Sequence, residues 1–239
     1  MGREFEITRD VEIQGTPEQV WDAVATGPGL ASWMFPSPIE GGGEGGPIQI
    51  WDPPNHLAIR MEGEGGWFNA LEYTIEGREG GTTTLRYVHS GIFDDAGWDD
   101  QYDAVDKHTD FYLHTLGQYL AHFSPKTATY IGDMPGGIDG PEASMVAEGF
   151  DRLKAAVGLD VASEGDTVTA DLGDYGRIEG VADHVGNSFA GIRTDDALFR
   201  FFGRNAFGGP VGMQVHHFGD VDAEAAKADL KRWLDRVYA

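Results

Sequence analysis

Cysteine is absent from this 239-residue chain, and several kinds of site are excluded with it. Without thiols the protein can form no disulfide, no thiolate metal centre and no cysteine nucleophile. The sequence also has no Gly-x-Ser-x-Gly and no His-Glu-x-x-His motif, and its glycine-rich stretches lack the Lys-Ser/Thr ending of a phosphate loop. His216 and His217 would point to opposite faces of a strand and could not chelate one ion together. We therefore expect no metal and no cofactor.

Basic residues are scarce. The chain has 17 Lys and Arg against 40 Asp and Glu, which gives a formal net charge of −23. Phosphate contacts need a basic face, so we expect no nucleic-acid partner. Anionic membranes are disfavoured for the same reason. A solvated acidic surface that keeps the protein soluble accounts for this charge.

Long apolar runs are missing as well. No stretch of about 18 apolar residues occurs, so we expect no membrane span. The first ten residues, MGREFEITRD, contain no apolar signal region. This favours a cytoplasmic protein.

The feature that is present most clearly is a helix over residues 98–123. This stretch has no proline, and its apolar residues recur at the 3.6-residue spacing of a helix face. Acidic residues crowd its first turns, where the helix dipole favours negative charge. Its inner face carries the polar tips of His108, Tyr112 and Tyr119. A purely structural helix would more often present leucine and isoleucine there.

The residues before this helix predict one strand, two short helices and then a meander of strands. Residues 5–13 alternate between apolar and polar, which is typical of a half-buried strand. Thr16, Pro17 and Gln19 predict a helix start with a capping box. A second short helix is expected over residues 30–35, before Pro36. Residues 48–90 then alternate as four strands.

This order resembles the START-like helix-grip superfamily, which includes birch-pollen-allergen-like proteins and polyketide cyclases. The local sequence is most similar to the branch named after the activator of the heat-shock chaperone ATPase. The matching pieces are residues 16–23 (TPEQVWDA), 33–35 (WMF) and 116–120 (LGQYL). The resemblance covers about residues 3–123. It implies a curved sheet wrapped on the long helix, with an apolar cavity between them for a lipid-like or polycyclic ligand.

The second half repeats this order of elements in a shorter form. Residues 127–131 predict a strand, and Pro141-Glu142 repeats the helix start seen at Pro17-Glu18. Five strands are expected over residues 167–172, 177–183, 188–193, 198–202 and 213–217, and Asp222 caps a last helix. We therefore expect an α+β protein of two tandem helix-grip units, residues 1–123 and 126–239, the second diverged and shortened.

Aromatic and histidine side chains are the candidates for lining the cavity. Ordinary core packing is the alternative for each of them, because aromatic residues dominate protein cores. The many polar-tipped rings on inward positions favour a site, since buried hydroxyl and imidazole groups need partners. The predicted ligand-binding residues are Trp33, Phe35, Trp51, Trp67, Tyr73, Tyr87, His89, Trp98, His108, Tyr112 and Tyr119.

Three hypotheses for the function follow. The first is a binding protein for a hydrophobic, polyketide-like or lipid-like molecule, used for sequestration and self-resistance or in natural-product biosynthesis. START-like proteins of enediyne antibiotic pathways resemble this use. The second is a cofactor-independent cyclase or dehydratase with His89, His108 and Tyr112 as candidate catalytic residues, although hydrogen-bonded structural histidines are an alternative. The third is a co-regulator of a chaperone ATPase; the sequence marks no surface for a protein partner.

Overall fold

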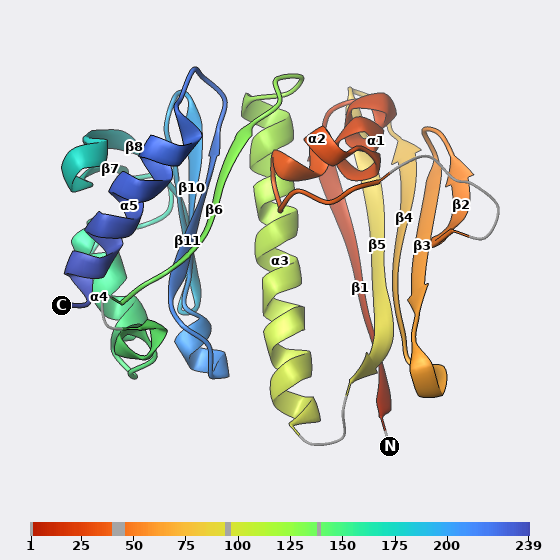
Figure 1. The fold of residues 1–239 in the computed structure, drawn as a ribbon. Coiled ribbons are helices and arrows are strands. Elements are labelled where there is room, and N and C mark those ends of the chain that lie inside the picture. Colours follow the sequence, from red (N-terminus) through yellow and green to blue (C-terminus); the bar gives the residue numbers. More distant parts are fainter. Residues whose placement is uncertain (1, 40–45, 94–96, 138–139) are drawn as a thin grey trace. The chain divides into compact units, whose positions relative to one another are not determined.

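Two units follow one another along the chain, residues 1–127 and 128–239. The computed structural model describes residues 2–39, 46–93, 97–137 and 140–239. In each unit the described residues form one antiparallel sheet and end in a helix (Figure 1). This confirms the α+β class and the repeated strand–helix–strands–helix order.

The first sheet is built from strands whose residues alternate between the interior and solvent. Its strand order is β1-β5-β4-β3-β2, so the first strand lies beside the last one and the others form a meander. Phe5, Ile7 and Ile13 of the first strand are buried, as the alternating pattern predicts. The strands are β1 (Arg3–Gln14), β2 (Ile48–Asp52), β3 (His56–Glu62), β4 (Phe68–Gly77) and β5 (Thr82–Phe93).

Two short helices follow the first strand. Helix α1 (Pro17–Ala25) begins with the predicted capping box: Gln19 N donates to Thr16 Oγ1, and Thr16 N donates to Gln19 Oε1. Helix α2 (Gly27–Ala31) begins and ends earlier than the predicted range of 30–35. Thr26 explains the shift, because its hydroxyl accepts from Gly29 N and caps the helix before Leu30 is reached.

The long helix α3 (Trp98–His122) confirms the stretch predicted over residues 98–123. It contacts β1, β5 and α1, and Leu116 and Leu120 of its C-terminal half are buried. A short 3₁₀ turn, η1 (Glu64–Gly66), connects β3 and β4. The interior of the first unit therefore lies between the sheet and α3 (Figure 1).

The second sheet has the same path with one strand more. Its order is β6-β11-β10-β9-β8-β7, so again the first strand of the unit pairs with the last. All five strands predicted between residues 167 and 217 are present. The strands are β6 (Thr129–Pro135), β7 (Thr167–Asp171), β8 (Arg177–Val185), β9 (Phe189–Arg193), β10 (Ala197–Phe202) and β11 (Gly212–His217).

The terminal helix of the second unit is shorter than that of the first. Its terminal helix α5 (Ala223–Val237) has 15 residues against 25 in α3, and Asp222 caps it as predicted. The helix expected from Pro141 is divided into a 3₁₀ turn, η2 (Pro141–Ser144), and α4 (Gly149–Ala156). Gly149, at the start of α4, passes so close to the Ser144 carbonyl that a Cβ would clash there. Two further 3₁₀ turns are η3 (Gly173–Tyr175) and η4 (Arg204–Phe207).

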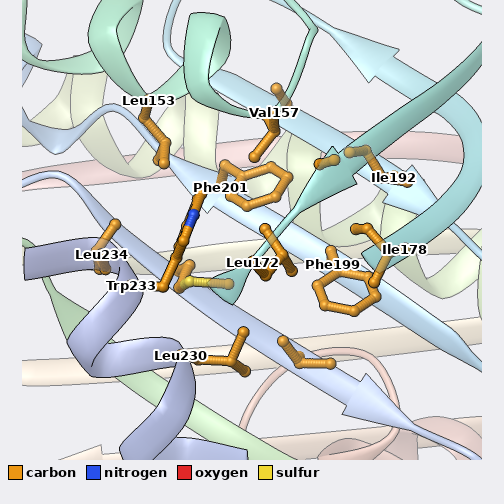
Figure 2. Packing of buried hydrophobic residues seen from close by; sticks show 14 of the residues in the cluster. Leu153, Val157, Leu172, Ile178, Ile192, Phe199, Phe201, Leu230, Trp233 and Leu234 are labelled. Carbon is orange, nitrogen blue, oxygen red and sulfur yellow. The ribbon is translucent and has the colours of Figure 1, made fainter. Parts of the chain in front are cut away.

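The interior of the second unit is filled by large side chains. Figure 2 shows Leu153 of α4 and Trp233 of α5 packed over the same face of the sheet as Phe199 and Phe201 of β10. All four are almost completely buried. Close packing of this kind leaves little room for a ligand between this sheet and its two helices.

Candidate functional site

A cavity of about 540 Å³ lies between the first sheet and α3. Strands β3, β4 and β5 form its floor, the N-terminal half of α3 forms one wall, and the chain after α2 forms another. Its volume falls within the range of about 300–1,000 Å³ that is typical of small-molecule sites. The lining residues are Leu30, Met34, Phe35, Ser37, Pro38, Ile39, Pro47, Ile59, Met61, Asn69, Leu71, Tyr73, His89, Ala104, Val105, His108, Thr109 and Tyr112.

Three neutral polar side chains lie on the floor of the cavity. Asn69 and Tyr73 belong to β4, where alternate residues face the same side of the sheet, and His89 lies opposite Leu71 on β5. Asn69 Nδ2 is 2.9 Å from His89 Nε2, within hydrogen-bond distance. The edge of the Phe5 ring packs against His89, with the ring centroids 5.0 Å apart.

Burial keeps these groups uncharged. It lowers the pKa of His89 from 6.5 to about 4, so the imidazole is neutral at physiological pH. It raises the pKa of Tyr73 well above its ordinary value, because a phenolate would lose its hydration there. Among the described lining residues none is Asp, Glu, Lys or Arg. The cavity is therefore apolar, with a few hydrogen-bonding groups and no formal charge.

The helix wall presents side chains at helical spacing. Val105, Thr109 and Tyr112 recur at intervals of four and three residues, which places them on one face of α3. His108 lies one turn before Tyr112, and its Nδ1 is 2.7 Å from the Ala104 carbonyl. Because a carbonyl only accepts, Nδ1 carries the proton of this hydrogen bond. Thr109 also lies near the hydroxyl of Tyr87 of β5.

The outer rim of the cavity is apolar and exposed. Phe35 is 45% exposed and Met61 is 51% exposed, although both line the cavity. Phe35 meets Tyr112 edge-to-face, with the ring centroids 6.3 Å apart. Phe35 and Met61 therefore lie where the cavity opens to solvent.

Five of the predicted ligand-binding residues line this cavity. Phe35 lies on the chain after α2, Tyr73 and His89 lie on the floor, and His108 and Tyr112 lie on the helix wall. The structure thus brings together the three candidate catalytic residues named from the sequence.

Three other predicted residues belong to the core and not to the cavity lining. Trp33 is 1% exposed, and its Nε1 donates to the Ala23 carbonyl. Tyr87 packs edge-to-face on Tyr73, and burial raises the pKa of its hydroxyl above the ordinary value. Tyr119 is buried near the C-terminal end of α3, where it forms hydrogen bonds with Ser32 and Ser124.

The remaining predicted tryptophans lie outside the cavity, at the surface. Trp51 is on the edge strand β2, is 38% exposed and touches Trp21. Trp67 follows η1 and is 43% exposed. Trp98 lies in the first turn of α3, and the Arg3 guanidinium lies 3.8 Å from its ring centroid.

Several lining residues gave no distinct signal in the sequence. Asn69 is a single amide at the start of a strand, and Thr109 lies between charged residues on α3. Leu30, Ile59 and Leu71 look like ordinary core residues. The inward alternation of β4 extends back from Leu71 to Asn69, and this was the one pattern that could have identified the amide.

The second unit has a hollow of a different kind. Its volume is about 530 Å³, and it lies where β8, the β9–β10 turn and the end of β11 meet. Charged side chains contribute to its lining, including Arg177, Glu179, Asp195 and Asp196. A hydrophobic molecule would therefore find a suitable environment in the first unit and not here.

Two further observations bear on metals and membranes. Within residues 2–39, 46–93, 97–137 and 140–239, no group of three or more His, Asp or Glu side chains could hold a metal ion. None of the described helices is both long and apolar enough to cross a membrane.

Arg9 fixes the helix wall to the edge of the sheet. Its Nε donates to Asp110 Oδ1 at 2.6 Å, and its Nη2 donates to Asp106 Oδ1 at 2.7 Å. These bonds raise the pKa of Arg9 above its ordinary value. Because the group is partly exposed, Arg9→Met should lower the free energy of unfolding by only about 1 kcal/mol.

Urea unfolding at low and high salt measures this contribution. The loss should shrink at high salt, because mobile ions screen exposed pairs. The control is Arg86→Met, which removes the more exposed pair with Asp10 between β5 and β1 and should change stability by less than about 0.5 kcal/mol. Equal losses in the two variants would show that Arg9 has no special role in holding α3.

No protein-family profile matches the sequence, and no curated protein matches it either. Three solved structures illustrate its likeness to known folds. The Aha1 dimer protein of Colwellia psychrerythraea is 19% identical over 48% of this chain and 96% of its own, with a TM-score of 0.39. CalU16 of Micromonospora echinospora is 18% identical over 49% and 83%, with a TM-score of 0.37.

DynU16, a protein of the dynemicin biosynthetic locus, is 13% identical over 98% of this chain and 95% of its own, with a TM-score of 0.40. At these identities and TM-scores the comparisons carry no argument about activity, so the function has to come from the cavity itself. The resemblance named from the sequence, to relatives of the activator of the heat-shock chaperone ATPase, is found again among solved structures.

Proposed function

We propose that the first unit binds a hydrophobic small molecule in the cavity between its sheet and α3. The observation that carries this proposal is the combination of about 540 Å³ of apolar space with convergent polar groups that bear no charge. This is the composition typical of small-molecule sites. A polyketide-like or lipid-like molecule fits these properties. A protein that holds such a molecule can sequester it or pass it on.

Binding is favoured over catalysis by the state of His89. A general base works best when its pKa lies near the operating pH. Burial lowers the pKa of His89 to about 4, which makes it a weak base and leaves almost none of it protonated as an acid at neutral pH. The imidazole is better suited to a fixed neutral hydrogen bond. The cyclase or dehydratase alternative would therefore need His108 and Tyr112 to act without it.

Tyr112→Ala should weaken ligand binding much more than it lowers the stability of the fold. The Tyr112 ring lines the cavity and is only partly buried, so its removal leaves less new empty space than truncation in a dry core. We expect the free energy of unfolding to fall by roughly 1 kcal/mol. Binding of a hydrophobic fluorescent dye should weaken about tenfold or more, which corresponds to about 1.4 kcal/mol.

Equilibrium denaturation and a dye titration on the same variant test this. Tyr102→Ala is the matched control, because Tyr102 lies on the same helix but stacks on Trp98 outside the cavity. It should leave dye binding unchanged. A stability loss above about 3 kcal/mol with unchanged dye affinity would mean that Tyr112 is part of the core. The cavity would then not be the binding site.

A further inference from the structure

The pair formed by Asn69 and His89 leaves hydrogen-bonding capacity unused. When the amide nitrogen donates to His89 Nε2, the second amide N–H and the Nδ1–H remain as donors, and the amide oxygen remains as an acceptor. When the amide is turned over, its oxygen accepts from Nε2–H, and its two N–H donors and the Nδ1 acceptor remain. Either way, at least one donor and one acceptor remain, and no other group in the described residues bonds to these two side chains.

Tyr73 adds a third polar group on the same face of the sheet, four residues after Asn69 on β4. Its ring is 1% exposed, and its hydroxyl has no hydrogen-bond partner among the residues that the structure describes. Buried hydroxyl groups are nearly always paired in folded proteins. Because Tyr73 lines the same cavity floor as Asn69, a cavity occupant is the natural partner for it.

The charge of the lining selects among possible occupants. About 24% of the residues in the whole chain are charged, yet none of the described lining residues is Asp, Glu, Lys or Arg. An ionised carboxylate or ammonium group placed there would lose its hydration without gaining a counter-charge. The same floor can satisfy a neutral oxygen, since it offers both donors and acceptors.

We infer that the ligand is an uncharged hydrophobic molecule with a hydroxyl or carbonyl oxygen, which Asn69, Tyr73 and His89 bind on the cavity floor. This inference rests on the proposed function and adds the polarity of the ligand and the residues that recognise it. It assigns Asn69 a direct role in binding.

Three probes that share the pyrene fluorophore test whether the cavity prefers uncharged ligands. They are 1-pyrenebutanol, 1-pyrenebutyrate and 1-butylpyrene, which carry a hydroxyl, a carboxylate and no polar group. At neutral pH the alcohol should bind the full-length protein at least about tenfold more tightly than the carboxylate. The carboxylate should gain affinity as the pH approaches its own pKa. Equal or tighter binding of the carboxylate at neutral pH would overturn the inference while leaving the proposed function in place.

Two variants test the role of the floor. Tyr73→Phe and Asn69→Leu should each weaken binding of the alcohol about fivefold, because each removes a hydrogen bond, and should leave butylpyrene binding unchanged. Tyr102→Phe is the matched control and should affect neither probe. If both variants weaken the two probes equally, or neither, the floor does not recognise the oxygen. If none of the three probes binds the wild-type protein, the proposed function itself fails.

Discussion

Asp183→Ala is expected to lower the free energy of unfolding of the second unit by about 3–5 kcal/mol. Asp183 of β8 accepts two hydrogen bonds from Arg200 of β10, at 2.8 Å and 2.7 Å. The side chains are 3% and 1% exposed. Removing the carboxylate would take from the buried guanidinium the two hydrogen bonds and the negative charge that Asp183 supplies, and this loss accounts for the large effect.

Gly191 of β9 shows that the sheet is built around this pair. It lies directly opposite Arg200 in the register of β9 and β10 and opposite His184 on β8. A Cβ at position 191 would collide with Arg200 Nη1 and Asp183 Oδ1. The missing side chain therefore leaves room for the paired groups between the strands.

Urea unfolding of the variant, followed by hydrogen exchange at the strand amides of the second unit, measures the loss. Asp174→Ala is the matched control, because its pair with Arg232 is exposed, and it should lower stability by less than about 1 kcal/mol. The double variant with Asp183→Leu and Arg200→Met should recover most of the loss, since apolar groups of similar size can replace a buried pair. A loss below about 1 kcal/mol for Asp183→Ala would show that water reaches the guanidinium.

Local signals in the sequence predicted most of the elements. The capping box at Thr16 and Gln19 and the alternation in the second half depend only on neighbouring residues, and the structure has them as expected. Helices α2 and α4 were displaced by a few residues. Their positions depend on a side-chain cap at Thr26 and on a close approach at Gly149, and neither is visible in hydrophobic spacing.

The cavity lining was harder to predict. The alternation of apolar and polar residues shows which side of the sheet a side chain faces, but not whether the cavity extends to that point along the strand. Tyr73 and Tyr87 face the same side of neighbouring strands, yet only Tyr73 lines the cavity. Trp33 and Phe35 are two residues apart, but one is in the core and the other at the rim. The curvature of the sheet and the path of the chain after α2 decide these cases, and both depend on contacts between distant residues.

Stability should fall when the pH is lowered from neutrality, because His89 is buried. His89 has a pKa of about 4 in the folded protein, against 6.5 as its ordinary value. The groups that pack against its ring are neutral: Phe5, Asn69 and Tyr87. Between these two pKa values the unfolded chain binds a proton that the folded chain does not, so stability falls as the pH is lowered. The full contribution of neutral His89 is present above about pH 6.5 and is lost progressively towards about pH 4.

His89→Gln should remove this part of the pH dependence, because glutamine can still hydrogen-bond to Asn69 but does not titrate in this range. Going from neutral pH to about pH 4.5, the wild-type protein should lose about 2 kcal/mol more of its unfolding free energy than the variant. Urea unfolding over a series of pH values measures the difference. His122→Gln, at the exposed end of α3, is the control and should follow the wild-type curve. Parallel curves for His89→Gln and wild type would show that burial does not lower the pKa of His89. The imidazole would then accept a proton at mildly acidic pH, and the cavity lining would not stay uncharged there.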